Sequence, residues 1–220
     1  MSIELKKRIV TSIFLLSLLT LMYLYSFVMI ISLIIIGIIS WIEFYGLISK
    51  ILFNNNAKEI FLRFLCKFFA LFYISALLYL IFIIESHYNH LKVFLFYSIL
   101  VAIFSDIAGL CFGKFFKGKK LSILSPNKTI SGSVGSFIGS LILIPVFSDY
   151  LSEFNTFQLT FITLIISLTS QIGDLFISYL KRKANVKDTS DILPGHGGFL
   201  DRIDGIIFSI PIGLLLFTNF

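Results

Sequence analysis

The chain has 220 residues, of which 57% are hydrophobic and only 14% charged, and its mean hydropathy is +0.97. This composition excludes a soluble globular protein, a disordered chain and a coiled coil, and it indicates a protein embedded in a membrane. Cys66 and Cys111 are the only cysteines, and both lie in or beside apolar runs, which excludes a disulfide scaffold. The net charge of +6 fits either nucleic acid or anionic lipid as a partner, and the positions of the basic residues decide between them.

Seven apolar runs approach the length of about 20 helical residues that crosses a hydrocarbon core of about 30 Å. In chain order they cover residues 9–25, 28–49, 66–84, 93–112, 133–147, 157–180 and 204–217. Almost nothing polar separates the first two, so they form a tight hairpin or only one of them is a span. The sequence predicts an all-α fold, a polytopic integral membrane helical bundle with about seven transmembrane helices in a range of six to nine.

The basic residues lie between these runs. With the N-terminus in the cytoplasm, 17 of the 18 Lys and Arg fall on the cytoplasmic side and only Lys92 lies outside. This distribution obeys the positive-inside rule, so topology explains the charge and we expect no nucleic acid as a partner. No small-residue cleavage site follows the basic cluster at residues 6–8, so we expect an uncleaved first span.

Several acidic residues lie in or near the later apolar runs. A carboxylate in the middle of a bilayer costs about 2.5 to 3.5 kcal/mol, so Asp106 and Asp174, each set in apolar sequence, need a partner or a function. The structural alternative for both is an interhelical pair, and Asp174 also shares a helix face with Lys181, so a capped or paired role is possible there without any chemistry. Asp201 and Asp204 also share a face if the last helix begins near them. The alternative for Asp204 is that it caps the N-terminus of that helix.

Two carboxylates on one face repel each other unless a cation lies between them. With Asp188 nearby and basic residues interleaved, the pattern suits a hard divalent cation together with a phosphate ligand.

Two loops carry further polar groups. Residues 193–198 contain Pro194 and three glycines, which predicts a turn whose backbone N–H groups approach phosphate oxygens. His196 in this turn is either a phosphate donor or an ordinary loop histidine. The order Ser125-Pro126-Asn127-Lys128-Thr129 offers hydroxyl and ammonium donors in a tight turn, which suits a polyphosphate, although it lacks the spacing of a P-loop.

The stretch from Ser178 to Asp204 resembles the signature of the phosphatidate cytidylyltransferases, also called CDP-diacylglycerol synthases. It reads Ser-Tyr-Leu-Lys-Arg from residue 178, Lys-Asp-Thr-Ser from 187 and Pro-Gly-His-Gly-Gly-Phe-Leu-Asp-Arg-Ile-Asp from 194, and it covers 27 residues. Gln171-Ile-Gly-Asp174, Asp106 and the Ser125–Thr129 loop support the resemblance. The chain departs from the family pattern at residues 108–110, where Ala-Gly-Leu stands in place of Gly-Ala-Tyr, and at Ser131 and Ile177, where acidic residues are usual.

The resemblance implies transfer of a cytidylyl group from CTP to phosphatidate at the cytoplasmic face of the bilayer. Residues 1–92 would supply N-terminal transmembrane helices and 93–220 the catalytic membrane region of one domain, residues 1–220. The implied catalytic residues are Lys187, Asp188, Asp201, Arg202 and Asp204. The implied ligands of Mg²⁺, alone or with a second cation, are Asp174, Asp188, Asp201 and Asp204. The implied substrate-binding residues are Ser125, Lys128, Thr129, Lys181, Arg182, His196, Gly197 and Gly198.

Two other functions fit parts of the pattern. A related CTP-using membrane enzyme would act on a polyprenol or an ether lipid. An ion-coupled transporter would use Asp106 and Asp174 to carry cations, but transport favours ionisable residues near the bilayer midplane, and most acids here cluster at one face. We expect a bacterial inner membrane protein, and a homodimer is compatible with the sequence.

Overall fold

The computed structural model describes residues 3–121, 125, 128–195 and 197–220, with the backbone alone for residues 3–8. The described residues form helices and no strand; two isolated β-bridges, Lys120 with Thr129 and Leu193 with Gly197, are the only ladder contacts among them. The helices are α1 (Ile3–Leu24), α2 (Ser26–Ile51), α3 (Ala57–His87), the 3₁₀ helix η1 (Asn89–Leu91), α4 (Lys92–Phe116), α5 (Ile130–Leu141), α6 (Leu143–Phe147), α7 (Thr156–Lys183) and α8 (Leu200–Asn219). The predicted all-α fold is confirmed.

The seven predicted apolar runs are helical except at Tyr25, which ends the first run, and at Ile142, which separates α5 from α6 within the fifth. Within the described part of the chain, five segments are long and apolar enough to cross a membrane: α2, α3, η1 with α4, α5 with α6, and α7. The apolar part of α1, Ile9–Leu24, is shorter, and α8 carries three charged residues in its first five positions. The protein is therefore an integral membrane protein with several membrane-crossing helices.

The chain forms two compact units. The first contains residues 1–87 and 180–203, and the second contains residues 88–179 and 204–220. The segment that carries most of the family signature thus belongs to the same unit as the three N-terminal helices.

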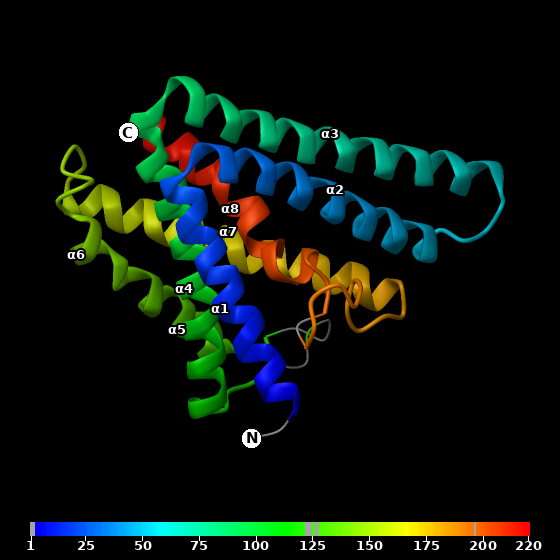
Figure 1. The fold of residues 1–220 in the computed structure, drawn as a ribbon. Helices are drawn as coiled ribbons and strands as arrows, with labels where there is room; N and C mark the ends of the chain where they lie inside the picture. Colours follow the sequence, from blue (N-terminus) through cyan, green and yellow to red (C-terminus); the bar gives the residue numbers. More distant parts are fainter. Residues whose placement is uncertain (1–2, 122–124, 126–127, 196) are drawn as a thin grey trace. The chain divides into compact units, whose positions relative to one another are not determined.

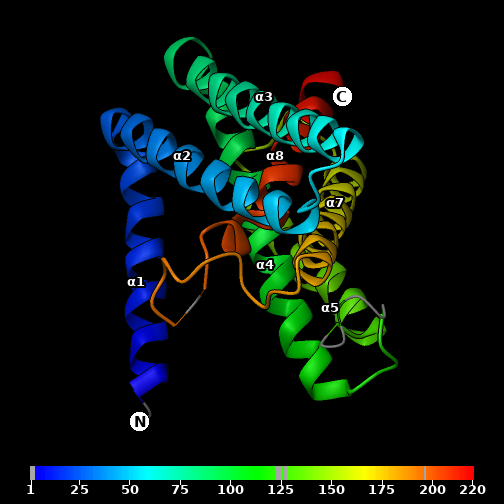
Figure 2. The same ribbon diagram turned by 90° about the vertical axis from the view of Figure 1, so that its right-hand side faces the viewer.

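The first unit is built on two helix connections. Tyr25, in an extended conformation with φ −127° and ψ 108°, is the one residue between α1 and α2, so the first two apolar runs form separate helices joined at a single residue. α2 and α3 run antiparallel and pack against each other (Figures 1 and 2). Their close approach depends on Gly37, because a Cβ at this position would overlap the side chain of Leu78. In the turn between them, Asn54 Nδ2 donates to Glu59 Oε1 at 2.8 Å.

The second unit is held by small residues and by hydrogen bonds between helices. A Cβ at Gly139 of α5 would overlap Ala108 of α4, and one at Gly205 of α8 would overlap Ser170 of α7. The hydroxyls of Ser105 on α4 and Ser167 on α7 are 2.9 Å apart and both are fully buried. Small residues allow helices to approach closely and hydroxyls then bridge them, which is typical of packing inside a membrane.

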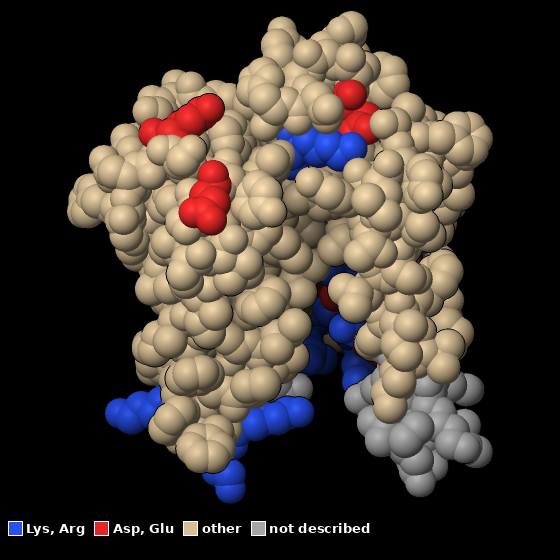
Figure 3. All heavy atoms as spheres, turned by 60° about the vertical axis from the view of Figure 1, so that its left-hand side comes forward, with Lys and Arg blue, Asp and Glu red and all other residues tan. Residues whose placement is uncertain are grey.

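Large apolar side chains cover much of the surface. On α3, Phe61, Phe69 and Phe72 are each more than 60% exposed. Figure 3 shows that almost all of the surface in view is uncharged. Such an apolar surface is unfavourable in water and favourable against lipid chains, which agrees with the length and composition of the helices.

Candidate functional site

The segment between α7 and α8 forms a closed turn. The Leu193 N–H donates to the Gly197 carbonyl at 2.8 Å, and the Gly197 N–H donates back at 3.1 Å. Gly195 and Gly197 have φ values of 78° and 80°, a region that glycine occupies without steric strain. The predicted turn is therefore present. His196 lies outside the described residues.

Asp201, in the first turn of α8, joins this segment to the end of α7. Its Oδ1 accepts from the Lys181 ammonium at 2.6 Å. Its Oδ2 accepts from the Thr189 N–H at 2.8 Å, the Thr189 hydroxyl at 3.0 Å and the Gly198 N–H at 3.1 Å. The Asp201 side chain is only 4% exposed. Three donors contact Oδ2 and one contacts Oδ1, so a cation would bind Asp201 at Oδ1 beside the Lys181 ammonium, or at Oδ2 by displacing a donor.

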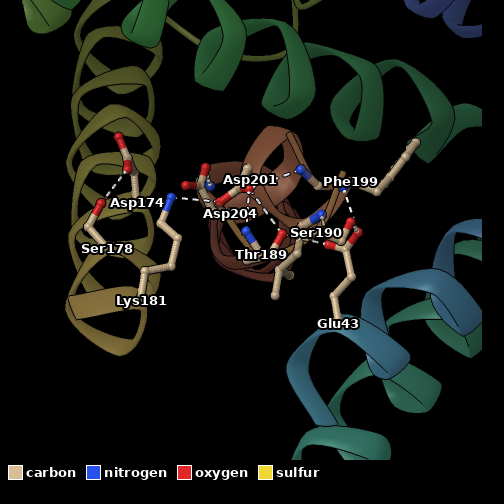
Figure 4. A network of polar contacts seen from close by, with 12 residues as sticks. Glu43, Asp174, Ser178, Lys181, Thr189, Ser190, Phe199, Asp201 and Asp204 are labelled. Carbon is tan, nitrogen blue, oxygen red and sulfur yellow. Dashed lines mark hydrogen bonds and ion pairs between the residues drawn. The ribbon is translucent and has the colours of Figure 1, made fainter. Parts of the chain in front are cut away.

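Glu43 of α2 is a second buried carboxylate in the same network, and the sequence analysis did not select it (Figure 4). Its oxygens accept from the hydroxyls of Thr189 at 2.8 Å and Ser190 at 2.5 Å. They also accept from the backbone N–H groups of Phe199 at 2.9 Å and Leu200 at 2.8 Å. Glu43 therefore satisfies two of the N–H groups that a helix N-terminus leaves without a partner within the helix.

The sequence did contain a signal for Glu43. It is the one acidic residue in the predicted span 28–49. Like Asp106 and Asp174, it is a carboxylate in an apolar run and therefore needs a partner or a function.

The glycines of the turn make contacts within the protein. The Gly197 N–H is bonded to Leu193, and the Gly198 N–H to Asp201. In this arrangement a phosphate close to the turn would be bound by side chains, since these two predicted amide donors are already engaged.

Asp188 packs against the turn. A Cβ at Gly197 would lie 3.0 Å from the Asp188 Cβ and 3.1 Å from its Oδ1. Asp188 is half-buried, and no described residue donates a hydrogen bond to its carboxylate. The predicted basic residues Arg182, Lys187 and Arg202 have exposed side chains, and Lys187 directly precedes Asp188 in the sequence. A partly buried carboxylate without a hydrogen-bond donor among the described residues is able to take part in binding a charged ligand.

In the second unit, the loop before α5 brings Lys128 to α7. The Lys128 N–H donates to the Ser125 carbonyl at 3.1 Å, and the Leu121 N–H donates to the Lys128 carbonyl at 2.8 Å. The Thr129 hydroxyl accepts from the Gly132 N–H at 3.0 Å and so caps the N-terminus of α5. The Lys128 ammonium forms an ion pair with Asp174 of α7. Pro126 and Asn127 lie outside the described residues.

Asp204 of α8 completes this second group. It is 5% exposed, and the carboxylates of Asp174 and of Asp106 on α4 lie close enough to disfavour its negative charge. Its Oδ1 accepts from the Gly205 N–H at 2.8 Å. Ser178 donates to Asp174 at 3.3 Å (Figure 4). Three carboxyl groups and one ammonium thus meet where three helices and a loop come together.

Asp174 forms a structural ion pair with another element of the fold, but its partner is the loop residue Lys128 and not Lys181, and Asp204 does not cap α8. Asp174 is paired with Lys128, and Lys181 is paired with Asp201, so the intrahelical pair of Asp174 with Lys181 is replaced by two tertiary pairs. Asp204 is not an N-cap, because α8 begins at Leu200 and Asp204 lies inside it. The expectation that the last helix begins near Asp201 is confirmed.

The four predicted metal ligands are divided between the two units. Asp188 and Asp201 belong to the first, and Asp174 and Asp204 belong to the second. Among the described residues, no group of three or more His, Cys, Asp or Glu side chains is arranged to hold a metal ion. The donor chemistry suits Mg²⁺, which prefers oxygen ligands and is commonly bound by one or two carboxylates that leave the other positions to water and substrate phosphates. The Asp174 and Asp204 pair is of this kind.

Comparisons with known proteins identify the family. The model of the family described as "Cytidylyltransferase family" matches residues 2–220. The phosphatidate cytidylyltransferase of Staphylococcus haemolyticus (strain JCSC1435) is 41% identical over 122 residues, which cover 54% of this chain and 46% of the relative. The phosphatidate cytidylyltransferase of Rickettsia prowazekii (strain Madrid E) is 39% identical over 141 residues, which cover 60% of this chain and 61% of the relative.

The alignment covers less than half of the staphylococcal relative and about three fifths of the rickettsial one, so the chain spans about half the length of the curated relatives it matches. The family model, in contrast, extends over nearly every residue of the chain. The chain therefore belongs to the cytidylyltransferase family.

Proposed function

We propose that this protein transfers the cytidylyl group of CTP to phosphatidate, forming CDP-diacylglycerol and pyrophosphate. Family membership and the printed names of the relatives support the reaction class and the substrates. The structural observation that carries the proposal is the meeting of Lys128 with Asp174 beside the buried Asp204. This group combines a donor for phosphate oxygens with oxygen ligands for a cation, the two requirements of a nucleotidyl transfer.

In the proposed reaction, an oxygen of the phosphatidate phosphate attacks the α-phosphorus of CTP. A new P–O bond forms, the bond between the α-phosphorus and the bridging oxygen breaks, and pyrophosphate leaves with the electron pair. The attacking phosphate is already largely ionised near neutral pH, so no strong general base is needed. Catalysis then consists of positioning the two phosphates and neutralising their charge.

The basic residues would perform that neutralisation. Lys128 would bind a phosphate oxygen with the ammonium group that now contacts Asp174, and Ser125 and Thr129 would support the nucleotide from the same loop. The other proposed phosphate ligands are Lys181, Arg182, His196, Lys187 and Arg202. Hydrogen bonds from ionised Lys and Arg side chains to phosphate oxygens are short and about twice as strong as those between neutral groups.

The carboxylates would hold the cation that accompanies CTP. Asp174 and Asp204 are the proposed principal ligands in the second unit, and Asp188 and Asp201 are the proposed cation ligands of the first unit. Bound Mg²⁺ would withdraw charge from the triphosphate and stabilise the departing pyrophosphate. Lys128 would compensate the charge of Asp174 until the cation arrives.

The proposed location of the site follows from the substrates. CTP is soluble in the cytosol and phosphatidate is a membrane lipid, so the site would lie at the cytoplasmic edge of the helices. With the N-terminus cytoplasmic, the positive-inside rule assigns the loops around Lys128 and Lys187 to that side. The matching relatives are bacterial proteins, and we place this protein in the inner membrane of a bacterium.

The test is an acceptor panel with the detergent-purified protein, CTP and Mg²⁺. Phosphatidate, a polyprenol and an ether-lipid phosphate are offered separately, each with and without EDTA. Formation of CDP-diacylglycerol and pyrophosphate only with phosphatidate and metal is the expected result. CTP consumption only with another acceptor would assign a different lipid substrate, and the absence of turnover with all three would exclude the proposed activity.

A further inference from the structure

We propose that Glu43 is a positioning residue for the cytidylyl transfer: it fixes the segment between Thr189 and Leu200 and thereby the carboxylates of Asp188 and Asp201. This inference rests on the proposed function and adds to it a residue outside the signature. All the contacts that carry it lie within the first unit (Figure 4).

Glu43 holds both ends of the segment with one side chain. The hydroxyls of Thr189 and Ser190 donate to it from the beginning of the segment. The N–H groups of Phe199 and Leu200 donate to it from the end. Asp188 immediately precedes Thr189 in the sequence, and Asp201 immediately follows Leu200. A displacement of Glu43 would therefore be transmitted directly to both predicted cation ligands.

The contacts require a carboxylate in particular. All four partners donate, so the group at this position must accept at both of its oxygens. An ionised carboxylate accepts only, whereas an amide presents an NH₂ group on one side. The hydroxyls of Thr189 and Ser190 can turn and accept from an amide, but the backbone N–H groups of Phe199 and Leu200 cannot. A glutamine would therefore leave one of these two N–H groups facing its own NH₂ group, although it has nearly the same size and shape as glutamate.

Gly198 has a role in this arrangement that differs from the predicted one. A Cβ at Gly198 would lie 2.7 Å from one Glu43 oxygen and 2.9 Å from the other, and it would also overlap the Thr189 hydroxyl. The absence of a side chain at residue 198 is thus what allows the segment to close around Glu43.

Two sources of positive charge compensate the buried carboxylates. Lys181 neutralises Asp201 directly. Glu43 lies at the N-terminus of α8, where the helix dipole and the free N–H groups favour an anion. The Thr189 hydroxyl carries a single hydrogen and lies 2.8 Å from Glu43 and 3.0 Å from Asp201, so it links the two carboxylates.

The experiment compares Glu43→Gln, Glu43→Asp and the control Glu85→Gln. Glu85 is a partly buried carboxylate in the same unit, at the other end of α3 from the α2–α3 turn, and it accepts a hydrogen bond from Ser26. Its substitution removes a charge from an interhelical contact without touching the segment. Each variant is assayed for kcat and for KM of CTP, and backbone hydrogen exchange is followed through the chain.

We expect Glu43→Gln to lower kcat on the order of 100-fold, as a misplacement of about 1 Å in a reacting group does, with a much smaller change in KM. Glu43→Asp keeps the charge and should recover part of the lost kcat. Exchange should accelerate at Phe199 and Leu200 in Glu43→Gln and stay slow in Glu85→Gln, whose kcat should match the wild type.

Three results would overturn the inference. One is wild-type kcat in Glu43→Gln. Another is accelerated exchange spread equally over α2 and α3 in both glutamine variants, since that pattern shows general destabilisation. The third is unchanged exchange at Phe199 and Leu200. The exchange measurement needs no turnover, so if the wild type were inactive toward phosphatidate, the proposed function would fail while the anchoring by Glu43 would still be decided.

Discussion

Lys128, in the loop before α5, forms an ion pair with Asp174 of α7. The contact joins the loop of residues 125–129 to the stretch of residues 171–174. These two motifs lie far apart in the sequence, and each resembles the family pattern. It also leaves both groups partly accessible, with side-chain exposures of 26% for Lys128 and 23% for Asp174. An ion pair of this kind is able to open and present its ammonium to a phosphate.

Replacing Lys128 should weaken the use of CTP. A hydrogen bond to a charged group contributes about 1.5 to 3 kcal/mol, so Lys128→Met should lower kcat/KM for CTP about 10- to 100-fold. Lys128→Arg keeps the charge, so its kcat/KM for CTP should lie between the values of Lys128→Met and the wild type. Steady-state kinetics with varied CTP measures the effect. Lys114→Met, at an exposed basic residue in the last turn of α4, is the matched control, and an equal loss there would contradict a specific role for Lys128.

Replacing Asp204 should remove a cation ligand without unfolding the protein. In Asp204→Asn the side-chain oxygen can still accept from the Gly205 N–H, and the new NH₂ can donate to Asp174. Charge stabilisation by a metal contributes several kcal/mol, so turnover should fall by more than about 100-fold and the remaining rate should need more Mg²⁺. Asp149→Asn changes an exposed acid and should have no effect. Normal turnover and normal Mg²⁺ dependence in Asp204→Asn would refute the ligand assignment.

Two glycine substitutions should have opposite effects on stability. A Cβ at Gly139 would overlap Ala108, so Gly139→Ala should destabilise the second unit by about 1 to 3 kcal/mol. Gly46 of α2 has no atom within 4 Å of the position of a Cβ, so Gly46→Ala should be neutral or stabilise its helix by up to about 1 kcal/mol. Thermal unfolding in one detergent compares the two variants. A lower unfolding temperature for Gly46→Ala than for Gly139→Ala would contradict the packing of α4 against α5.

The two ends of α3 should lie on opposite sides of the membrane. In a chain whose Cys66 and Cys111 are replaced by serine, a cysteine at His87 should react with an impermeant thiol reagent added from outside. A cysteine at Asn55, in the α2–α3 turn, should react only after the membrane is opened. Labelling of intact cells tests access from outside, and labelling of inverted vesicles tests access from the cytoplasmic side. Labelling of both positions from the same side would contradict the predicted orientation.

The helices could be predicted from the sequence because the signal is local. A run of apolar residues bounded by charge is sufficient to form a helix in a membrane, where backbone groups must be bonded within the segment. The glycine turn at residues 193–197 was equally local, and its positive φ values at Gly195 and Gly197 are of the kind that glycine favours.

The partners of the charged residues could not be predicted in the same way. Lys181 shares a helix face with Asp174, yet it pairs with Asp201, and Asp174 pairs with a loop lysine. Spacing along one helix shows which residues can meet, but the approach of other elements decides which of them do. Glu43 illustrates the same limit: its need for a partner is visible in the apolar run, whereas its partners, Thr189 and Leu200, are 146 and 157 residues away.

The measurement that tests the central claim most directly is the fate of the CTP phosphates. The protein is supplied with phosphatidate, Mg²⁺ and CTP labelled at either the α- or the γ-phosphorus, and lipid and aqueous products are separated. Cytidylyl transfer predicts that the α label appears in CDP-diacylglycerol and the γ label in pyrophosphate. Transfer of the γ label to the lipid, or retention of both labels in CTP, would contradict it.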